Sequence, residues 1–282
     1  MRSAMPEIPE LQAHAERLES EFGGAVLAGF RPLTFTALKT AVPDPASAVG
    51  SPLRSVGRRG KYLILSFDPT SFVVHLMQGG RLRPDENQSA KPRGGIARWT
   101  FDDGRALLLT EPGSERKAGV WVTDGDPLDQ EPLTALGPDA TDLDVEALGD
   151  VLAQRSGRLH GLLRDQHVIA GIGRRLSNEI CHRARLSPFV NTSKLDAEQT
   201  VALHTAISAC IEESLADERE REEMVNAGQR TAAVHHRAGE ACPVCGDTIR
   251  SVTYRAYEVD YCPTCQTGGK VLADNTTSRF LR

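Results

Sequence analysis

The feature that most constrains this chain lies near its C-terminus, where four of its six cysteines form two C-x-x-C pairs. Cys242-Pro-Val-Cys245 and Cys262-Pro-Thr-Cys265 are separated by 16 residues. This spacing is typical of a zinc ribbon, in which four thiolates hold one tetrahedral zinc ion. Gly246, directly after the first pair, suits the tight turn that such a knuckle needs. We expect one structural zinc, because four protein ligands leave no position for a reacting water.

Two alternative uses of paired cysteines are disulfides in a secreted protein and a redox-active motif. The start, MRSAMPEIPE, places acids where a signal peptide carries its apolar core, and no window holds the roughly 18–20 apolar residues of a membrane span. We therefore expect a cytoplasmic protein that does not contact membranes, and favour zinc over disulfides. A redox motif does not need two copies at ribbon spacing. Cys181 and Cys210 stand alone and are expected to be small apolar residues on helices.

The formal net charge of −5 does not indicate a nucleic-acid binder, but the charges are unevenly distributed. Residues 51–100 contain nine Lys and Arg against three acids, whereas residues 124–150 contain nine acids and no Lys or Arg. Salt confines the field of a charge to about 10 Å, so a local basic patch binds phosphates even in an acidic protein.

Periodicity along the chain separates a β-rich region from a helical one. Residues 6–22 repeat apolar side chains at helical spacing and end at Gly23-Gly24, which predicts an amphipathic helix. The following β-rich runs, separated by turn residues, predict antiparallel sheet structure. These runs are 61–67, 72–76, 97–101 and 106–110, with a hairpin turn at 102–104 and an exposed polar loop at 85–95. From about 145 to 226 the pattern is helical, with a Gly-Ile-Gly turn at 171–173 and a long helix at 195–225.

These patterns predict an α+β multidomain chain. We expect an N-terminal domain over 1–123, an acidic linker over 124–144, a helical domain over 145–235, the zinc ribbon over 236–266 and a flexible tail over 267–282.

The segment Met5-Pro6-Glu7-Ile8-Pro9-Glu10 is typical of a helix start, with proline in the first turn and acids near the positive end of the helix dipole. Removal of the methionine would also expose a proline amine, whose pKa lies nearer neutrality than that of lysine. Such an amine attacks an aldehyde-like carbon and forms an iminium. Glu7 and Glu10 are then candidates for the proton transfers.

Two further segments combine basic residues with tight turns. Residues 57–63, GRRGKYL, form a basic turn that leads into a strand, where Lys61 is a candidate phosphate contact and a solubilising edge turn is the alternative. Residues 74–82, VHLMQGGRL, end a strand in a glycine-rich loop with large side chains at its tip, which suits a protein that unstacks a base. His75 by itself is expected to be a core histidine.

Taken in order, these motifs resemble the formamidopyrimidine-DNA glycosylase/endonuclease VIII (Fpg/Nei) family of base-excision repair enzymes. The resemblance extends from Met5 to Cys265. It also includes Leu136-Gly137-Pro138 and the run DQHVIAGIG at 165–173. It implies an N-terminal β-sandwich with flanking helices, a helix-two-turns-helix domain and a C-terminal zinc ribbon. It also implies a glycosylase with AP-lyase activity that binds damaged or abasic DNA, flips out the damaged base and acts as a nucleoid-associated monomer.

The resemblance also implies roles for individual residues. By position, Pro6 matches the nucleophile that attacks C1′ of the damaged nucleotide, and Glu7 matches the acid that assists opening of the sugar. Glu10 matches a second acid, and Lys61 matches a lysine that contacts the phosphate beside the lesion. The expected DNA-binding residues are Arg58, Arg59, Gln78, Arg81, Arg174 and Arg255.

The chain departs from the family pattern at its start and in its loops. Met1–Ala4 precede Met5, so Pro6 has a free amine only if translation starts at Met5 or the extension is removed. Met77-Gln78 replaces a glycine-methionine pair. The segment over 111–119 is longer than in the family. Lys117 and Ala118 occupy the positions of an arginine and a phenylalanine that, in the family, fill the space left in the DNA by the flipped base.

Further departures lie in the C-terminal half. Arg174 replaces an asparagine that holds phosphate, and Tyr257 replaces an arginine of the ribbon, with Arg255 two positions earlier. The short segment 226–240 favours oxidised pyrimidines, abasic sites or single-stranded substrates over oxidised guanine.

These departures leave a rival to the active glycosylase, namely a catalytically impaired member that binds damaged DNA. A third hypothesis, a zinc-ribbon protein acting on RNA or in transcription, depends on the ribbon alone.

Overall fold

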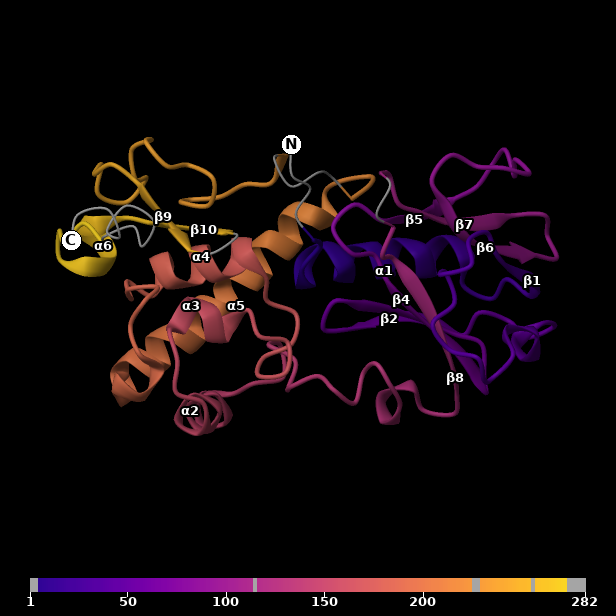
Figure 1. Ribbon diagram of the computed structural model, residues 1–282, viewed down its shortest axis with the longest axis horizontal. Helices are drawn as coiled ribbons and strands as arrows, with labels where there is room; N and C mark the ends of the chain where they lie inside the picture. The colour runs from indigo at the N-terminus through magenta and orange to yellow at the C-terminus, as the bar shows by residue number, and fades with distance from the viewer. Residues whose placement is uncertain (1–4, 114–115, 225–228, 255–256, 273–282) are drawn as a thin grey trace. The chain divides into compact units, whose positions relative to one another are not determined.

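The computed structural model (Figure 1) describes residues 5–113, 116–224, 229–254 and 257–272. The chain divides into two compact units. One comprises Met1–Leu136 with Glu218–Gly228, and the other comprises Gly137–Asp217 with Gln229–Arg282. Among the described residues, no helix is long and apolar enough to cross a membrane.

The first unit begins with helix α1 (Ile8–Phe22), as the apolar spacing predicts. Leu11, Ala15, Leu18 and Phe22 are all buried on one face of the helix. The helix ends at Gly23, whose N–H donates to the Glu19 carbonyl at 2.8 Å. The packed face of α1 therefore fixes its first turn, which contains Glu10 and directly follows Pro6 and the N-cap residue Glu7.

Two four-stranded antiparallel sheets form the body of this unit. One sheet has the order β1-β6-β7-β5 and the other has the order β2-β3-β4-β8. The first sheet comprises β1 (Leu27–Pro32), β6 (Gly95–Phe101), β7 (Ala106–Thr110) and β5 (Arg81–Pro84). The second comprises β2 (Ser55–Arg59), β3 (Tyr62–Ser66), β4 (Thr70–His75) and β8 (Gly119–Asp124). One 3-10 turn, η1 (Pro45–Ala48), lies between β1 and β2.

The inner faces of the two sheets share one hydrophobic core, so the unit is a β-sandwich. Phe72 of β4 contacts Trp99 of β6 edge to face, with 5.7 Å between the ring centroids. Leu63 and Val74 of one sheet and Leu107 and Leu109 of the other are fully buried in the same cluster. The predicted strands and the hairpin turn at 102–104 are confirmed, and Gly104 has a φ of +86°.

The acidic segment over 124–144, expected to be a linker, is packed rather than extended. It contains η2 (Pro127–Asp129), and Leu133 is buried against Ile64 and Val73 of the sandwich. Further along, Asp139 pairs with Ala170 in an isolated bridge within the second unit. An apolar contact of Leu133 therefore fastens the first part of this segment, and a backbone bridge of Asp139 fastens the later part.

The second unit contains the predicted helices. These are α2 (Val145–Gln154), α3 (Leu159–Leu163), α4 (Arg174–Arg183) and α5 (Ala197–Arg219), with the turn η3 (Thr192–Lys194) before α5. The carboxylate of Asp144 accepts the Ala147 N–H at 2.8 Å and caps α2. The long helix α5 ends at Arg219, earlier than the expected residue 225.

The ribbon follows as the hairpin of β9 (Arg250–Tyr254) and β10 (Tyr257–Tyr261) and the short helix α6 (Pro263–Thr267). The expectation of a flexible tail over 267–282 is wrong for its first residues, because Thr267 belongs to α6 and the chain is described as far as Leu272. The Leu272 N–H donates to the Tyr261 hydroxyl at 2.7 Å, and residues 273–282 lie outside the described part.

Candidate active site and zinc centre

Pro6 and its two neighbouring acids are buried together at the start of α1. Glu7 occupies the N-cap, and the Glu10 carboxylate accepts the Glu7 N–H at 2.7 Å, as in a capping box. Glu7 and Glu10 are 2% and 0% exposed. Carboxylates are tolerated here because the N–H groups of the helix start and the positive end of the helix dipole stabilise negative charge. The structure thus brings together all three residues that the sequence singled out, whereas Met1–Ala4 lie outside the described residues.

Lys61 lies in the turn between β2 and β3, which Gly60 makes possible with a φ of +55°. Its side chain is buried, and its charge acts on His75. His75 pairs with Tyr62 across β3 and β4, with the two rings 4.6 Å apart. Burial, and secondarily the Lys61 charge, lowers the pKa of His75 to about 4. His75 is therefore neutral at physiological pH, and Lys61 is held at the strand start that the sequence predicted.

The glycine-rich loop after β4 is a tight turn anchored by His75. The Met77 N–H donates to His75 Nδ1 at 3.1 Å, and Met77 has a φ of +55°. Gly80 is required because a Cβ there would collide with the Leu76 carbonyl oxygen. Of the large side chains expected at the loop tip, Met77 is partly buried against the sandwich core. Gln78 is exposed at the tip.

The segment that replaces the family's arginine-phenylalanine pair is folded inward. The Glu111 carboxylate accepts the N–H groups of Lys117 and Ala118 at 2.6 and 2.7 Å, so the backbone turns around a buried acid. Ala118 is 1% exposed and belongs to the hydrophobic core, whereas Lys117 is exposed. At position 118 the chain therefore presents no side chain that reaches into DNA.

Basic side chains line a cavity of about 620 Å³ in the same unit. It lies where the 76–80 loop, the residues before β6 and the segment after β7 meet. Of its lining residues only Arg81 was a predicted contact. Three arginines that individual motifs did not indicate also line the cavity, namely Arg83, Arg93 and Arg116. Arg83 and Arg93 belong to the basic stretch 51–100, whose charge count was the available signal. The other predicted arginines, Arg58 and Arg59, lie at the end of β2 and are half-buried.

In the second unit, Arg174 is exposed at the first residue of α4. The preceding Gly-Ile-Gly turn is clamped by the Gln166 amide, which accepts the Gly171 N–H at 2.9 Å and donates to the Ile172 carbonyl at 2.8 Å. A cation beside the N–H groups and the positive dipole end of a helix start suits a phosphate. Gln166 belongs to the 165–173 motif, but no feature of the sequence indicated that it holds this turn.

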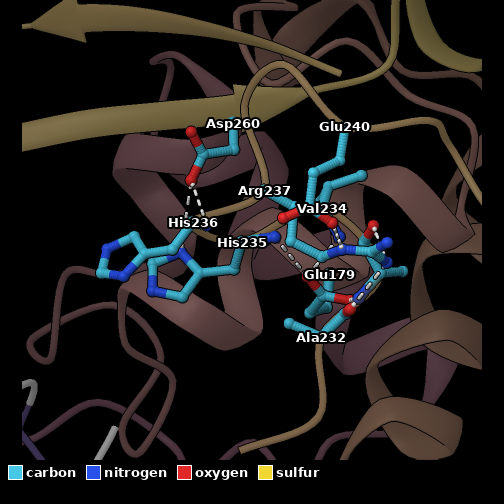
Figure 2. Close-up of polar contacts among 9 residues, drawn as sticks. Glu179, Ala232, Val234, His235, His236, Arg237, Glu240 and Asp260 are labelled. Atoms are coloured by element: carbon cyan, nitrogen blue, oxygen red, sulfur yellow. Dashed lines mark hydrogen bonds and ion pairs between the residues drawn. The ribbon is translucent and has the colours of Figure 1, made fainter. Parts of the chain in front are cut away.

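The loop before the ribbon is fastened to α4 and β10 by two carboxylates (Figure 2). Glu179 of α4 accepts the N–H groups of Ala233, Val234 and His235 at 2.6, 3.0 and 2.9 Å. Asp260 of β10 accepts the His236 N–H at 2.8 Å. No sequence motif indicated either residue. Together they fix the chain that leads into the first cysteine pair.

The four cysteines fit one zinc ion. All four Sγ atoms lie within 4.8 Å of one another. Cys242 and Cys265 are 3.9 Å apart and Cys245 and Cys262 are 3.4 Å apart, close to the about 3.8 Å between thiolates of tetrahedral zinc. When bound, zinc supplies a structural cross-link rather than an activated water. The predicted turn at Gly246 is confirmed by its φ of +77°.

The zinc centre has one partner that the sequence did not predict. His182 of α4 lies with Nε2 3.3 Å from Cys242 Sγ. Since a zinc-bound thiolate only accepts hydrogen bonds, this nitrogen would donate and orient the sulfur. The predicted DNA contact Arg255 lies outside the described residues.

Known proteins match this arrangement along nearly the whole chain. Three family profiles match in order. They are the formamidopyrimidine-DNA glycosylase N-terminal domain over 5–121, its H2TH domain over 134–224, and the zinc finger found in FPG and IleRS over 239–268. The formamidopyrimidine-DNA glycosylase of Chloroflexus aurantiacus is 32% identical over 278 residues, covering 93% of this chain and 98% of the relative.

Solved structures have the same fold. The MutM (Fpg) protein from Thermus thermophilus superposes with a TM-score of 0.80 at 25% identity, covering 94% of this chain and 100% of that one. The Lactococcus lactis Fpg, solved in complex with an abasic site containing DNA, has a TM-score of 0.82 at 20% identity and covers 93% and 99%. The resemblance in the motifs is thus confirmed, and the chain belongs to the formamidopyrimidine-DNA glycosylase family.

Proposed function

We propose that this protein, by its family a base-excision-repair DNA glycosylase and AP lyase, works through the amine of Pro6. The observation that carries the proposal is the burial of Pro6, Glu7 and Glu10 in one capped helix start. This geometry holds a secondary amine beside two carboxylates inside a folded unit. A DNA strand with a flipped nucleotide is the substrate, and we expect one protein molecule to act alone on it.

The chemistry balances with the groups present. The Pro6 nitrogen attacks C1′ of the damaged nucleotide, the C1′–N bond to the base breaks, and the base leaves with a proton. Opening of the sugar, assisted by Glu7, gives an iminium between Pro6 and C1′. Loss of a proton from C2′ then expels the 3′ phosphate by elimination, which cuts the strand. Glu10 positions the Pro6–Glu7 peptide by accepting its N–H.

Basic residues of each unit are proposed to contact DNA phosphates. Lys61 is proposed to contact the phosphate beside the lesion, and Arg58, Arg59, Gln78 and Arg81 are proposed to contact other parts of the DNA. Arg174 is the proposed contact in the second unit, and Arg255 stays a sequence-based proposal. The abasic-site DNA in the Lactococcus lactis complex supports a substrate of this kind.

The test is borohydride trapping on DNA with one abasic site, using protein that begins at Pro6. Borohydride reduces the iminium to a stable crosslink, so we expect one covalent adduct per protein. Pro6→Gly keeps a primary amine and is expected to trap less. Binding without any trapping would favour the second candidate function.

That second candidate is a non-catalytic protein that binds damaged DNA. The observation that favours it is Ala118, which is buried in the core where the family pattern has a phenylalanine. Glycosylase turnover on duplexes that carry oxidised pyrimidines separates the two functions, because a pure binding protein releases no base.

A further inference from the structure

One aromatic side chain of the first unit stands entirely in solvent. Phe35 has a relative exposure of 102%. In the described part of the chain, every other phenylalanine and tryptophan is buried or half-buried. Exposing a phenylalanine forgoes roughly 1.5–3 kcal/mol of burial. A ring exposed in this way is available for stacking on a binding partner.

The turn that carries Phe35 is held by backbone bonds on both sides. Before it, the Leu33 N–H donates to the Ile96 carbonyl at 2.8 Å. After it, the Val120 N–H donates to the Ala37 carbonyl at 2.8 Å, and the Lys39 N–H donates to the Val120 carbonyl at 2.8 Å. Phe35 is therefore displayed on a turn that is ordered before any partner binds, which lowers the entropy lost on binding.

The same bonds place this turn beside the segment that holds Ala118. Leu38 forms a parallel bridge with Val120, so the chain after Phe35 runs alongside the chain after Ala118. A Cβ at Gly119 would collide with the Lys39 side chain, which therefore lies across that residue. Ala118 points into the core, while Phe35 points into solvent from the neighbouring segment.

The surroundings of Phe35 are cationic. Arg31 and Lys39 flank it in sequence, and Arg116 and Lys117 belong to the adjacent segment; all four are exposed. Neither 31–39 nor 116–120 contains an acid. The Leu33 side chain lies against Gly95, two residues from Arg93 of the basic cavity. An aromatic ring among cations fits nucleic acid, where the ring stacks on a base and the cations meet phosphates.

We propose that Phe35 stacks against a base that is unstacked when a nucleotide leaves the duplex. The inference rests on the proposed function, since it needs damaged DNA as the partner. A protein partner is disfavoured because a stable protein interface buries about 800 Å² on each side around an apolar centre, whereas Phe35 stands among cations. Phe35 thus offers an aromatic ring to DNA from the segment beside Ala118, whose own side chain points into the core.

The experiment uses a duplex with a tetrahydrofuran abasic analogue and 2-aminopurine beside or opposite it. Because 2-aminopurine fluoresces when unstacked, wild-type protein that stacks Phe35 on it is expected to quench the signal, and Phe35→Ala is expected to leave it bright. Phe35→Ala should also weaken the Kd by about tenfold, and Phe35→Trp should restore both readouts. The matched control is Leu128→Ala, which removes an exposed apolar side chain from an acidic segment and is expected to change neither.

Borohydride trapping on a duplex that carries a natural abasic site, at saturating protein, separates this inference from the proposed function. If Phe35→Ala binds and quenches like the wild type while trapping is intact, the stacking inference is wrong and the Pro6 proposal stands. If quenching depends on Phe35 but the wild type traps nothing, the stacking inference stands and the lyase proposal fails. A wild type that does not bind the duplex overturns both.

Discussion

The sandwich of the first unit and the ribbon of the second are stabilised in different ways. The sandwich has a continuous apolar core that extends from α1 through both sheets. In the ribbon, one buried cluster joins Val234 and Ile249 to the zinc ligands Cys242 and Cys262. The carboxylates of Glu179 and Asp260 accept backbone N–H groups of the chain that leads into it. The geometry of the proposed active site therefore depends on hydrophobic packing, whereas the fold of the ribbon depends also on zinc and on charged hydrogen-bond acceptors.

The largest effect is expected for the N-terminus of the first unit, where the residues before Pro6 decide whether its amine is free. Protein that keeps Met1–Ala4 has no free amine on Pro6, so borohydride trapping is expected to be abolished, while protein that begins at Pro6 traps. The affinity for abasic-site DNA should stay within a few-fold, because the basic residues are untouched. Equal trapping by both forms would contradict the proline mechanism.

The next effect is removal of zinc, which should break the ribbon and spare the sandwich. Structural zinc contributes about 10–16 kcal/mol to the folding of small zinc domains. Hydrogen exchange on the full chain, read peptide by peptide, is expected to show loss of protection over 239–268 after chelation, with the sandwich strands unchanged. DNA binding should weaken in parallel. Protection of the ribbon without zinc would show that its carboxylate bonds suffice.

Glu179 provides a smaller test of the polar anchoring. Glu179→Ala removes the acceptor of three backbone N–H groups, and hydrogen bonds to a charged acceptor contribute about 1.5–3 kcal/mol each. We expect the second unit to lose about 3 kcal/mol or more of unfolding free energy, with faster release of zinc to a chromophoric chelator. Glu213→Gln is the matched control, because it breaks only an exposed ion pair with Arg183, a type of pair that contributes about 0–1 kcal/mol. Equal effects of the two variants would refute the anchoring role.

The smallest effect concerns pH and the sandwich. Burial lowers the pKa of both His14 and His75 to about 4. Above pH 6.5 these imidazoles are neutral in the folded and unfolded states, so they cause no loss of stability there. Between pH 6.5 and about 4 the unfolded chain binds protons that the folded chain does not, so stability falls by up to about 3 kcal/mol per histidine.

Urea unfolding of the full chain at pH 7 and pH 4.5 measures this slope. His75→Gln is expected to reduce the slope by about a quarter, because burial also lowers the pKa values of His14, His160 and His235. A slope that does not change in the variant would show that His75 takes up its proton without unfolding.

The sequence predicted most of the fold because the signals were local. The helical spacing of Leu11, Leu18 and Phe22 and the β-rich runs that became β3, β4, β6 and β7 reflect burial on one face or on both. Strands β1, β2 and β5 went unrecognised, since each contains basic residues, glycine or proline and gains its order from neighbouring strands, and β8 was missed although its Val-Trp-Val run is β-rich. The expected exposed loop at 85–95 is correct over most of its length, but Asp85 forms a buried ion pair with Arg98 at 2.7 Å, and Gly94 and Gly95 are buried, with Gly95 already in β6.

The residues of the candidate site likewise divide into those with a local sequence signal and those without one. Pro6, Glu7, Glu10 and the four cysteines could be predicted because each set is contiguous or regularly spaced in the chain. Glu111, Glu179 and His182 could not, since their partners are six to sixty residues away and only the tertiary structure brings them together. Phe35 had no sequence signal either, because an isolated phenylalanine in a β-rich region is normally a core residue.

The central claim is that the Pro6 nitrogen forms the covalent bond to DNA, and mass spectrometry of the trapped complex tests it most directly. After borohydride reduction and digestion, the adduct mass is predicted on the N-terminal peptide that starts at Pro6, with fragment ions placing it on the first residue. An adduct on the Lys61 peptide, or no adduct from protein that binds abasic-site DNA, would contradict the account.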